Sequence, residues 1–195
     1  MEIFLLRKER DIVPINGKTS TYHVHKIDIE LGEKMITIDT LTSAYFDSFK
    51  DLFCDYFIDD LHVKMERNRI KEKIVDDQII QSFMENVIYI DIITEAKVMK
   101  GFIIYQIDSD RSDWNERPGD GFIREQFVCR DSRKKGYGTL LLLHAETILK
   151  AQKVTSVYLT ANDEENAKAF YISQGYVSEQ EKSAFNALDY YSKIL

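Results

Sequence analysis

The sequence predicts an α/β (α+β) fold, in which a mixed, mostly antiparallel sheet carries helices on both sides. Three observations predict it. Residues 122–143 read as an extended apolar run, a glycine-containing turn and a leucine-rich helix, in that order. Two β-rich runs, Val87 to Thr94 and Val98 to Ile107, are joined by a short polar segment, which is typical of an antiparallel hairpin. The chain has 195 residues, 44% of them hydrophobic, and this is enough for one sizeable core.

The first 34 residues are predicted to form an extension, and residues 35–195 the main domain. Two runs of strand character, Glu2 to Arg7 and Thr21 to Leu31, flank the turn-prone segment Pro14 to Gly17. This pattern favours a β-hairpin. The hairpin is either an added edge of the sheet or an element of a homodimer.

The main domain is expected to begin with a strand over Met35 to Leu41. Apolar and aromatic residues then recur with helical spacing from residue 44 to 57, and a second helix is expected over about residues 68–86. The polar stretch Asp108 to Asp120 connects the third and fourth strands, and long connections of this kind often carry binding chemistry.

Residues 133–138, Arg-Lys-Lys-Gly-Tyr-Gly, have the composition of an anion-binding turn. The glycines allow a tight bend that turns several backbone N–H groups toward one point, and the following helix directs its positive dipole end there. Four basic residues against one acidic residue make residues 130–135 locally positive, although the whole chain carries a net charge of −7. A small polyanion such as a pyrophosphate therefore fits better than nucleic acid.

The turn resembles the acyl-CoA-binding motif of the GNAT (Gcn5-related N-acetyltransferase) superfamily, because Arg133, Gly136 and Gly138 match the pattern RxxGxG. Residues 127–129 are similar to the fourth strand of that fold, residues 154–160 to the fifth, and residues 166–176 to the next helix with its exit glycine. The resemblance implies an enzyme that transfers acetyl from acetyl-CoA to a primary amine of a small molecule or peptide, by direct attack in a ternary complex.

The resemblance also implies a coenzyme A site. Backbone groups of Phe127 and Cys129 would pair with the pantetheine arm, and an N–H near Val128 would polarise the thioester carbonyl. Arg133 either contacts phosphate or fastens the loop. The turn would supply the remaining donors, which come from Lys134, Lys135, Gly136, Tyr137, Gly138 and Thr139. The asparagine that relatives use to bind pantetheine or order the loop is replaced here by Glu164, so Asn162 or Asn166 would substitute.

Two residues are candidates for proton transfer. Glu125 occupies a strand position where many relatives carry a general base, and its alternative is an outward-facing glutamate paired with a neighbour. Tyr171, four residues before Gly175, matches the tyrosine that relatives place near the sulfur of coenzyme A, and its alternative is simple packing. Cys129 is disfavoured as a nucleophile because no histidine lies nearby in the sequence.

Two other functions are compatible with part of this interpretation. One is a sensor that binds acyl-CoA without turnover. The other is a nucleotide-binding enzyme, which is weakened because the turn lacks the Gly-Lys-Ser/Thr ending of a phosphate-binding loop. The acceptor amine is not readable, although Asp108, Asp110, Asp113 and Glu116 hint at a cationic one.

The remaining expectations concern metals and location. Cys54 and Cys129 have no partner motif, and His23 and His25 lack a third ligand, so no disulfide or metal site is expected. No apolar run reaches the ~18 residues of a membrane span, and the N-terminus lacks the features of a leader. A cytoplasmic location without membrane attachment is expected.

Overall fold

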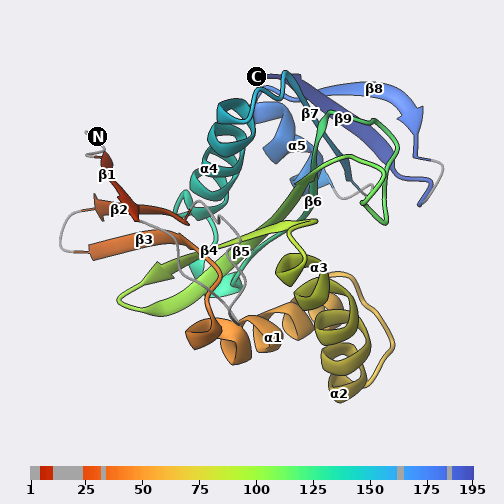
Figure 1. Cartoon of the computed structure of the whole chain (residues 1–195). Helices are drawn as coiled ribbons and strands as arrows, with labels where there is room; N and C mark the ends of the chain where they lie inside the picture. Colours follow the sequence, from red (N-terminus) through yellow and green to blue (C-terminus); the bar gives the residue numbers. More distant parts are fainter. Residues whose placement is uncertain (1–4, 11–23, 32–33, 162–164, 184–185) are drawn as a thin grey trace.

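The protein folds around one mixed sheet. The computed structural model describes residues 5–10, 24–31, 34–161, 165–183 and 186–195 (Figure 1). Within these residues the sheet has nine strands in the order β1-β2-β3-β4-β5-β6-β7-β9-β8. Only β6 and β7 run parallel, and every other neighbouring pair is antiparallel. The predicted fold class is therefore confirmed.

The strands β1 to β7 agree with the predicted runs to within a few residues, whereas the sequence pattern did not indicate β8. Their bounds are β1 (Leu5–Arg10), β2 (Val24–Leu31), β3 (Lys34–Thr40), β4 (Tyr89–Glu95), β5 (Val98–Ile107), β6 (Gly121–Val128), β7 (Ser156–Ala161), β8 (Val177–Lys182) and β9 (Asp189–Ile194). β8 alternates little between apolar and polar residues and is mostly exposed, so it lacks the period-two pattern of a half-buried strand.

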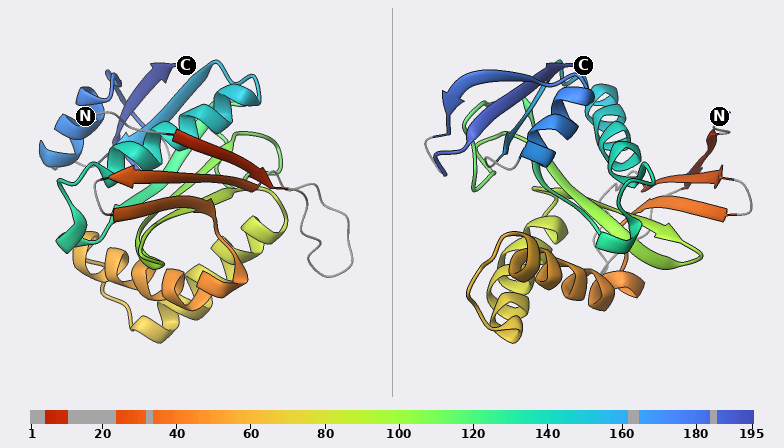
Figure 2. Two further views of the ribbon diagram at one scale, coloured as in Figure 1. Left: turned by 90° about the vertical axis from the view of Figure 1, so that its left-hand side faces the viewer. Right: turned by 180° about the vertical axis from the view of Figure 1, so that it is seen from behind.

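Helical segments cover both faces of the sheet. One layer contains the short turn η1 (Ser43–Tyr45), then α1 (Phe46–Asp55), η2 (Tyr56–Asp60), α2 (Arg67–Ile70), η3 (Lys71–Ile80) and α3 (Gln81–Met84). The opposite layer contains α4 (Tyr137–Ala151) and α5 (Glu165–Ser173), and the short turn η4 (Arg130–Ser132) precedes α4. Figures 1 and 2 show the two layers on opposite sides of the sheet.

A hydrophobic core fills each side. Leu141, Leu142 and Leu149 of α4 pack on the sheet and are fully buried. On the other side, Phe49 and Phe53 of α1 contact Phe102 of β5, with ring centroids 5.1 and 5.7 Å apart. The aromatic spacing predicted for the first helix is thus explained by packing.

The predicted N-terminal hairpin is present. β1 pairs antiparallel with β2 from Leu5 opposite Ile29 to Arg10 opposite Val24, and β2 pairs antiparallel with β3. β1 is consequently the edge strand at the end of the sheet away from β8. The predicted turn at residues 14–17 lies outside the described residues. A role in dimer formation stays a prediction.

The sheet opens between β6 and β7. These strands pair only where residues 121–123 face residues 157–159. On the other side of β6, Tyr105 faces Ile123 while Ile104 faces Glu125, so Arg124 is the extra residue of a β-bulge. A bulge bends its strand and increases its twist. The bend turns the second half of β6 away from β7 and creates the space for the site.

Candidate active site

A cavity of about 390 Å³ lies where β6 and β7 diverge. Its walls come from η2, the bulged part of β6, the end of β7, α5 and the loops beside them. The lining residues are Tyr56, Asp60, Leu61, Trp114, Phe122, Ile123, Arg124, Glu125, Gln126, Thr160, Ala161, Ala167, Tyr171, Asn186 and Leu188. Both residues expected to transfer protons, Glu125 and Tyr171, are in this set.

Glu125 is held by a partner that the sequence analysis missed. The hydroxyl of Tyr56 donates to Glu125 Oε2 at 2.5 Å. Burial raises the pKa of Glu125, while the hydrogen bond from Tyr56 and the charge of Arg124 act in the opposite direction. A carboxyl group with a raised pKa is suited to accept a proton near neutral pH.

Tyr56 lies at the start of η2, where the helix widens. The N–H of Leu61 donates to the carbonyl of Tyr56 at 3.0 Å, a spacing of five residues instead of four. Such π-helical turns are frequent at functional sites. The sequence showed Tyr56 only as one member of an aromatic run, and its partner is 69 residues away.

Tyr171 projects from α5 toward β6. Its hydroxyl donates to Gln126 Oε1 at 3.3 Å, and Gln126 Nε2 donates to the carbonyl of Gly138 at 2.6 Å. Gln126 therefore bridges the tyrosine and the first turn of α4. Burial, and secondarily the charge of Glu125, raise the pKa of Tyr171, so the phenol keeps its proton at neutral pH.

The turn before α4 presents backbone donors. Gly136 has φ 85°, which is strained for residues with a side chain, and α4 begins immediately after it. The first helical bond runs from the Leu140 N–H to the Gly136 carbonyl at 3.0 Å. The N–H groups of Tyr137, Gly138 and Thr139 precede that bond, and no side chain caps the helix. This geometry suits an anion.

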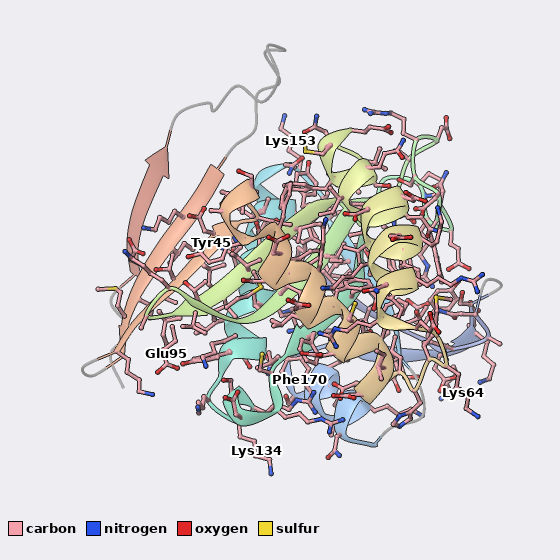
Figure 3. The ribbon with its side chains drawn as sticks, turned by 90° about the horizontal axis from the view of Figure 1, so that it is seen from below. Tyr45, Lys64, Glu95, Lys134, Lys153 and Phe170 are labelled. Atoms are coloured by element: carbon pink, nitrogen blue, oxygen red, sulfur yellow. The ribbon has the colours of Figure 1, made fainter. Side chains whose placement is uncertain are left out.

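The charged side chains of the turn play different parts. Lys134 and Lys135 are exposed, and Lys134 points outward from the turn in Figure 3. Arg133 instead donates through Nε to the Val128 carbonyl at 2.9 Å and forms an ion pair with Asp60. Asp60 also pairs with Arg130 at 3.2 Å. These contacts match the loop-fastening role considered for Arg133.

Tyr137 contributes to the turn through its backbone. Its ring is buried, and its hydroxyl donates to Glu95 Oε2 at 2.6 Å. Burial and the hydrogen bond to Glu95 raise the pKa of Tyr137 to about 12. The side chain is thus occupied in joining α4 to the end of β4.

The expectation that Cys129 offers a free backbone group is wrong. Its N–H donates to the carbonyl of Lys100 in β5 at 2.9 Å. Because backbone groups alternate along an antiparallel strand, those of Phe127 also face β5, whereas those of Gln126 and Val128 face the opening. A one-residue difference in register exchanges the two edges of a strand. The Val128 N–H remains a candidate for the thioester carbonyl.

Other predicted residues lie outside the cavity lining. Asn166 is exposed near the start of α5, and Asn162 lies outside the described residues. Cys54 and Cys129 are free thiols, and His23 also falls outside the described residues. Among the described residues, no group of three or more His, Cys, Asp or Glu side chains could hold a metal ion.

The acidic connection before β6 gives no support to a cationic acceptor. Asp108 is buried and accepts from Tyr158 at 2.5 Å. Asp113 pairs with Arg124 at 2.7 Å, and Glu116 accepts from Ser183 at 2.9 Å. Three of the four carboxylates thus have partners within the protein, which weakens the argument from their charge for a cationic acceptor.

These features suit a coenzyme A-dependent acyltransferase. The strands β6 and β7 diverge, the turn before α4 carries backbone N–H groups that the helix does not use, and Glu125 and Tyr171 line one cavity. The sequence model of the acetyltransferase (GNAT) family matches residues 46–176. The chain therefore belongs to this family, and acetyl-CoA is its co-substrate. No curated protein sequence matches the chain.

Solved structures agree with the family. The chain is similar to a PaiA N-acetyltransferase from Thermoplasma acidophilum in complex with coenzyme A, at 16% identity and a TM-score of 0.64, covering 82% of this chain and 99% of that one. It is also similar to a ribosomal-protein-alanine N-acetyltransferase from Brucella melitensis, at 15% identity and a TM-score of 0.60, covering 81% and 99%. At these identities the likeness concerns the fold.

No helix in the described ranges is long and apolar enough to span a membrane.

Proposed function

We propose that the protein transfers acetyl from acetyl-CoA to a primary amine of a small molecule or peptide, by direct attack within a ternary complex. The observation that carries the proposal is that Glu125 and Tyr171 line one cavity, and that Gln126 connects Tyr171 to the first turn of α4, where the backbone donors lie. This is the set of groups that acyl transfer from a thioester to an amine requires.

In the proposed reaction the turn binds the pyrophosphate of coenzyme A. The pantetheine arm enters the opening beside β6, where the Val128 N–H polarises the thioester carbonyl. Glu125 takes one proton from the ammonium form of the acceptor. The neutral nitrogen then attacks the carbonyl carbon, and a C–N bond replaces the C–S bond. Tyr171 gives its proton to the departing thiolate, and the second proton lost by nitrogen restores the phenol.

Substitutions separate catalysis from binding. Tyr171→Phe removes the proton donor, and we expect kcat to fall about 100-fold while the affinity for coenzyme A is retained. Tyr89→Phe is the matched control, since the Tyr89 hydroxyl donates to Gln152 at 3.0 Å, outside the cavity lining. Equal activity of both variants would remove Tyr171 from the mechanism.

A panel of amines tests the function itself. Release of free thiol from acetyl-CoA is followed with each amine, and calorimetry measures coenzyme A binding in the same preparation. Amine-dependent thiol release supports the proposal. Binding of coenzyme A without thiol release for any amine would favour the acyl-CoA sensor instead.

A further inference from the structure

The two carboxylates that line the cavity differ in whether a cationic side chain neutralises them. Glu125 receives a hydrogen bond from Tyr56, but none of the salt bridges among the described residues involves it. Asp60, the other carboxylate of the lining, pairs with Arg130 and Arg133. Among the described residues, the cavity thus offers one carboxylate without a salt bridge that a substrate ammonium group can approach.

The cation of the lining is already neutralised. Arg124 Nη1 and Nη2 donate to the two carboxylate oxygens of Asp113 at 2.7 and 3.2 Å, and Nη1 also donates to Gln106 Oε1 at 3.1 Å. Two parallel bonds of this kind are a strong and specific arrangement. Asp113 comes from the connection before β6 and is not part of the lining, so it holds the guanidinium from outside the cavity.

Among the described residues, the rest of the lining holds no second cation. It combines apolar side chains, such as Leu61, Trp114 and Phe122, with neutral polar ones, such as Thr160 and Asn186. An acceptor that carries a carboxylate would have to bury it without a free cation, or break the Arg124–Asp113 pair. Burying the carboxylate without a cation is costly, because the charge loses its hydration without compensation. Breaking the pair costs the two parallel hydrogen bonds between Arg124 and Asp113, while Asp113, whose side chain is 58% exposed, stays hydrated.

We propose that the acceptor is a small amine without a carboxylate or phosphate near its nitrogen, and that Asp113 enforces this choice by neutralising Arg124. The inference rests on the proposed function and narrows its substrate class. A cavity of about 390 Å³ is in the range that holds small molecules, which favours a small amine over a folded protein surface.

Pairs of acceptors that differ by one carboxylate test the proposal. Phenethylamine is compared with phenylalanine, tyramine with tyrosine, and isopentylamine with leucine. The enzymes are the wild type, Asp113→Ala and, as matched control, Asp110→Ala. Asp110 lies in the same connection and is exposed. Rates of thiol release give kcat/KM, and thermal shifts of the coenzyme A-bound protein report binding of each ligand.

We expect the wild type to prefer the amine of at least one pair by about 100-fold in kcat/KM, the loss that an uncompensated buried charge produces. Asp113→Ala frees Arg124, and the preference should fall by about 10-fold or more through better use of the amino acid. Asp110→Ala should leave the preference unchanged.

Different results overturn different statements. If the wild type prefers the amino acids, or if Asp113→Ala leaves the preference unchanged, the inference about the acceptor is wrong while acetyl transfer stands. If the amines bind in preference to the amino acids but no thiol is released, the acceptor class stands and the proposed catalysis fails. If neither member of any pair binds, the inference also fails.

Discussion

Tyr56→Phe is the most informative single substitution, because it removes one oxygen atom from the support of the proposed base. The hydroxyl of Tyr56 donates to Glu125 Oε2 at 2.5 Å, and the phenylalanine ring can keep the contacts with Phe53 and Phe102. The hydrogen bond favours the ionised carboxylate, and burial opposes it. Without the hydroxyl the pKa of Glu125 should rise further, and the acid limb of the pH–rate profile should move to higher pH.

The size of the expected loss follows from the charge on Glu125, which accepts the hydrogen bond. A hydrogen bond to a charged group contributes about 1.5–3 kcal/mol. Since about 1.4 kcal/mol corresponds to a factor of ten, kcat/KM on the acid limb should fall about ten- to a hundred-fold. At alkaline pH, where Glu125 is ionised in both proteins, the difference should become small. Arg124 and Tyr171 also interact electrostatically with Glu125, Asp60 lines the same cavity, and all three are unchanged in both proteins.

The assay is thiol release from saturating acetyl-CoA across the pH range, with the acceptor varied. Tyr45→Phe is the matched control, because Tyr45 packs on the same core but is not part of the cavity lining. It should leave the profile unchanged. A loss in Tyr56→Phe that is equal at every pH would refute the reasoning, since it would show that Tyr56 does not act through the ionisation of Glu125.

Two further predictions concern the turn and the end of β4. Gly136→Ala and Gly119→Ala both place a side chain at positive φ, 85° and 92°, in open space, and each should lower stability by about 1–2 kcal/mol. Gly119→Ala is the control, and only Gly136→Ala should weaken coenzyme A binding in calorimetry. Equal affinities of the two variants would contradict the role of the turn. Glu95 has its pKa lowered to about 2 from an ordinary 4.5, first by Lys34 and then by Tyr137. A depressed pKa means that the stabilisation is present above pH 4.5 and is lost as pH falls toward 2, so Glu95→Gln should lower the melting temperature at neutral pH and remove the difference in acid.

The parts of the site that could be predicted are those encoded in adjacent residues. The turn at residues 133–138 contains its own glycines and is followed at once by α4, so its conformation depends on local sequence. The hairpin of β4 and β5 was predictable for the same reason, because period and turn are both local.

The parts that could not be predicted depend on distant contacts. Tyr56 reaches Glu125 across 69 residues, and no spacing rule relates the two positions. The acidic connection looked like a cation site because sequence shows charge but not compensation, and only the fold reveals that Asp113 pairs with Arg124. The backbone of Cys129 was assigned to the wrong edge of β6, since the bonding direction depends on the register with β5.

Hydrogen–deuterium exchange of the backbone amides, with and without coenzyme A, tests the central claim most directly. The account predicts protection of residues 134–139 and of the Val128 amide when coenzyme A is bound, with Lys100 to Phe102 of β5 little changed. Binding of coenzyme A that protects another part of the chain, or that leaves the turn unprotected, would contradict it.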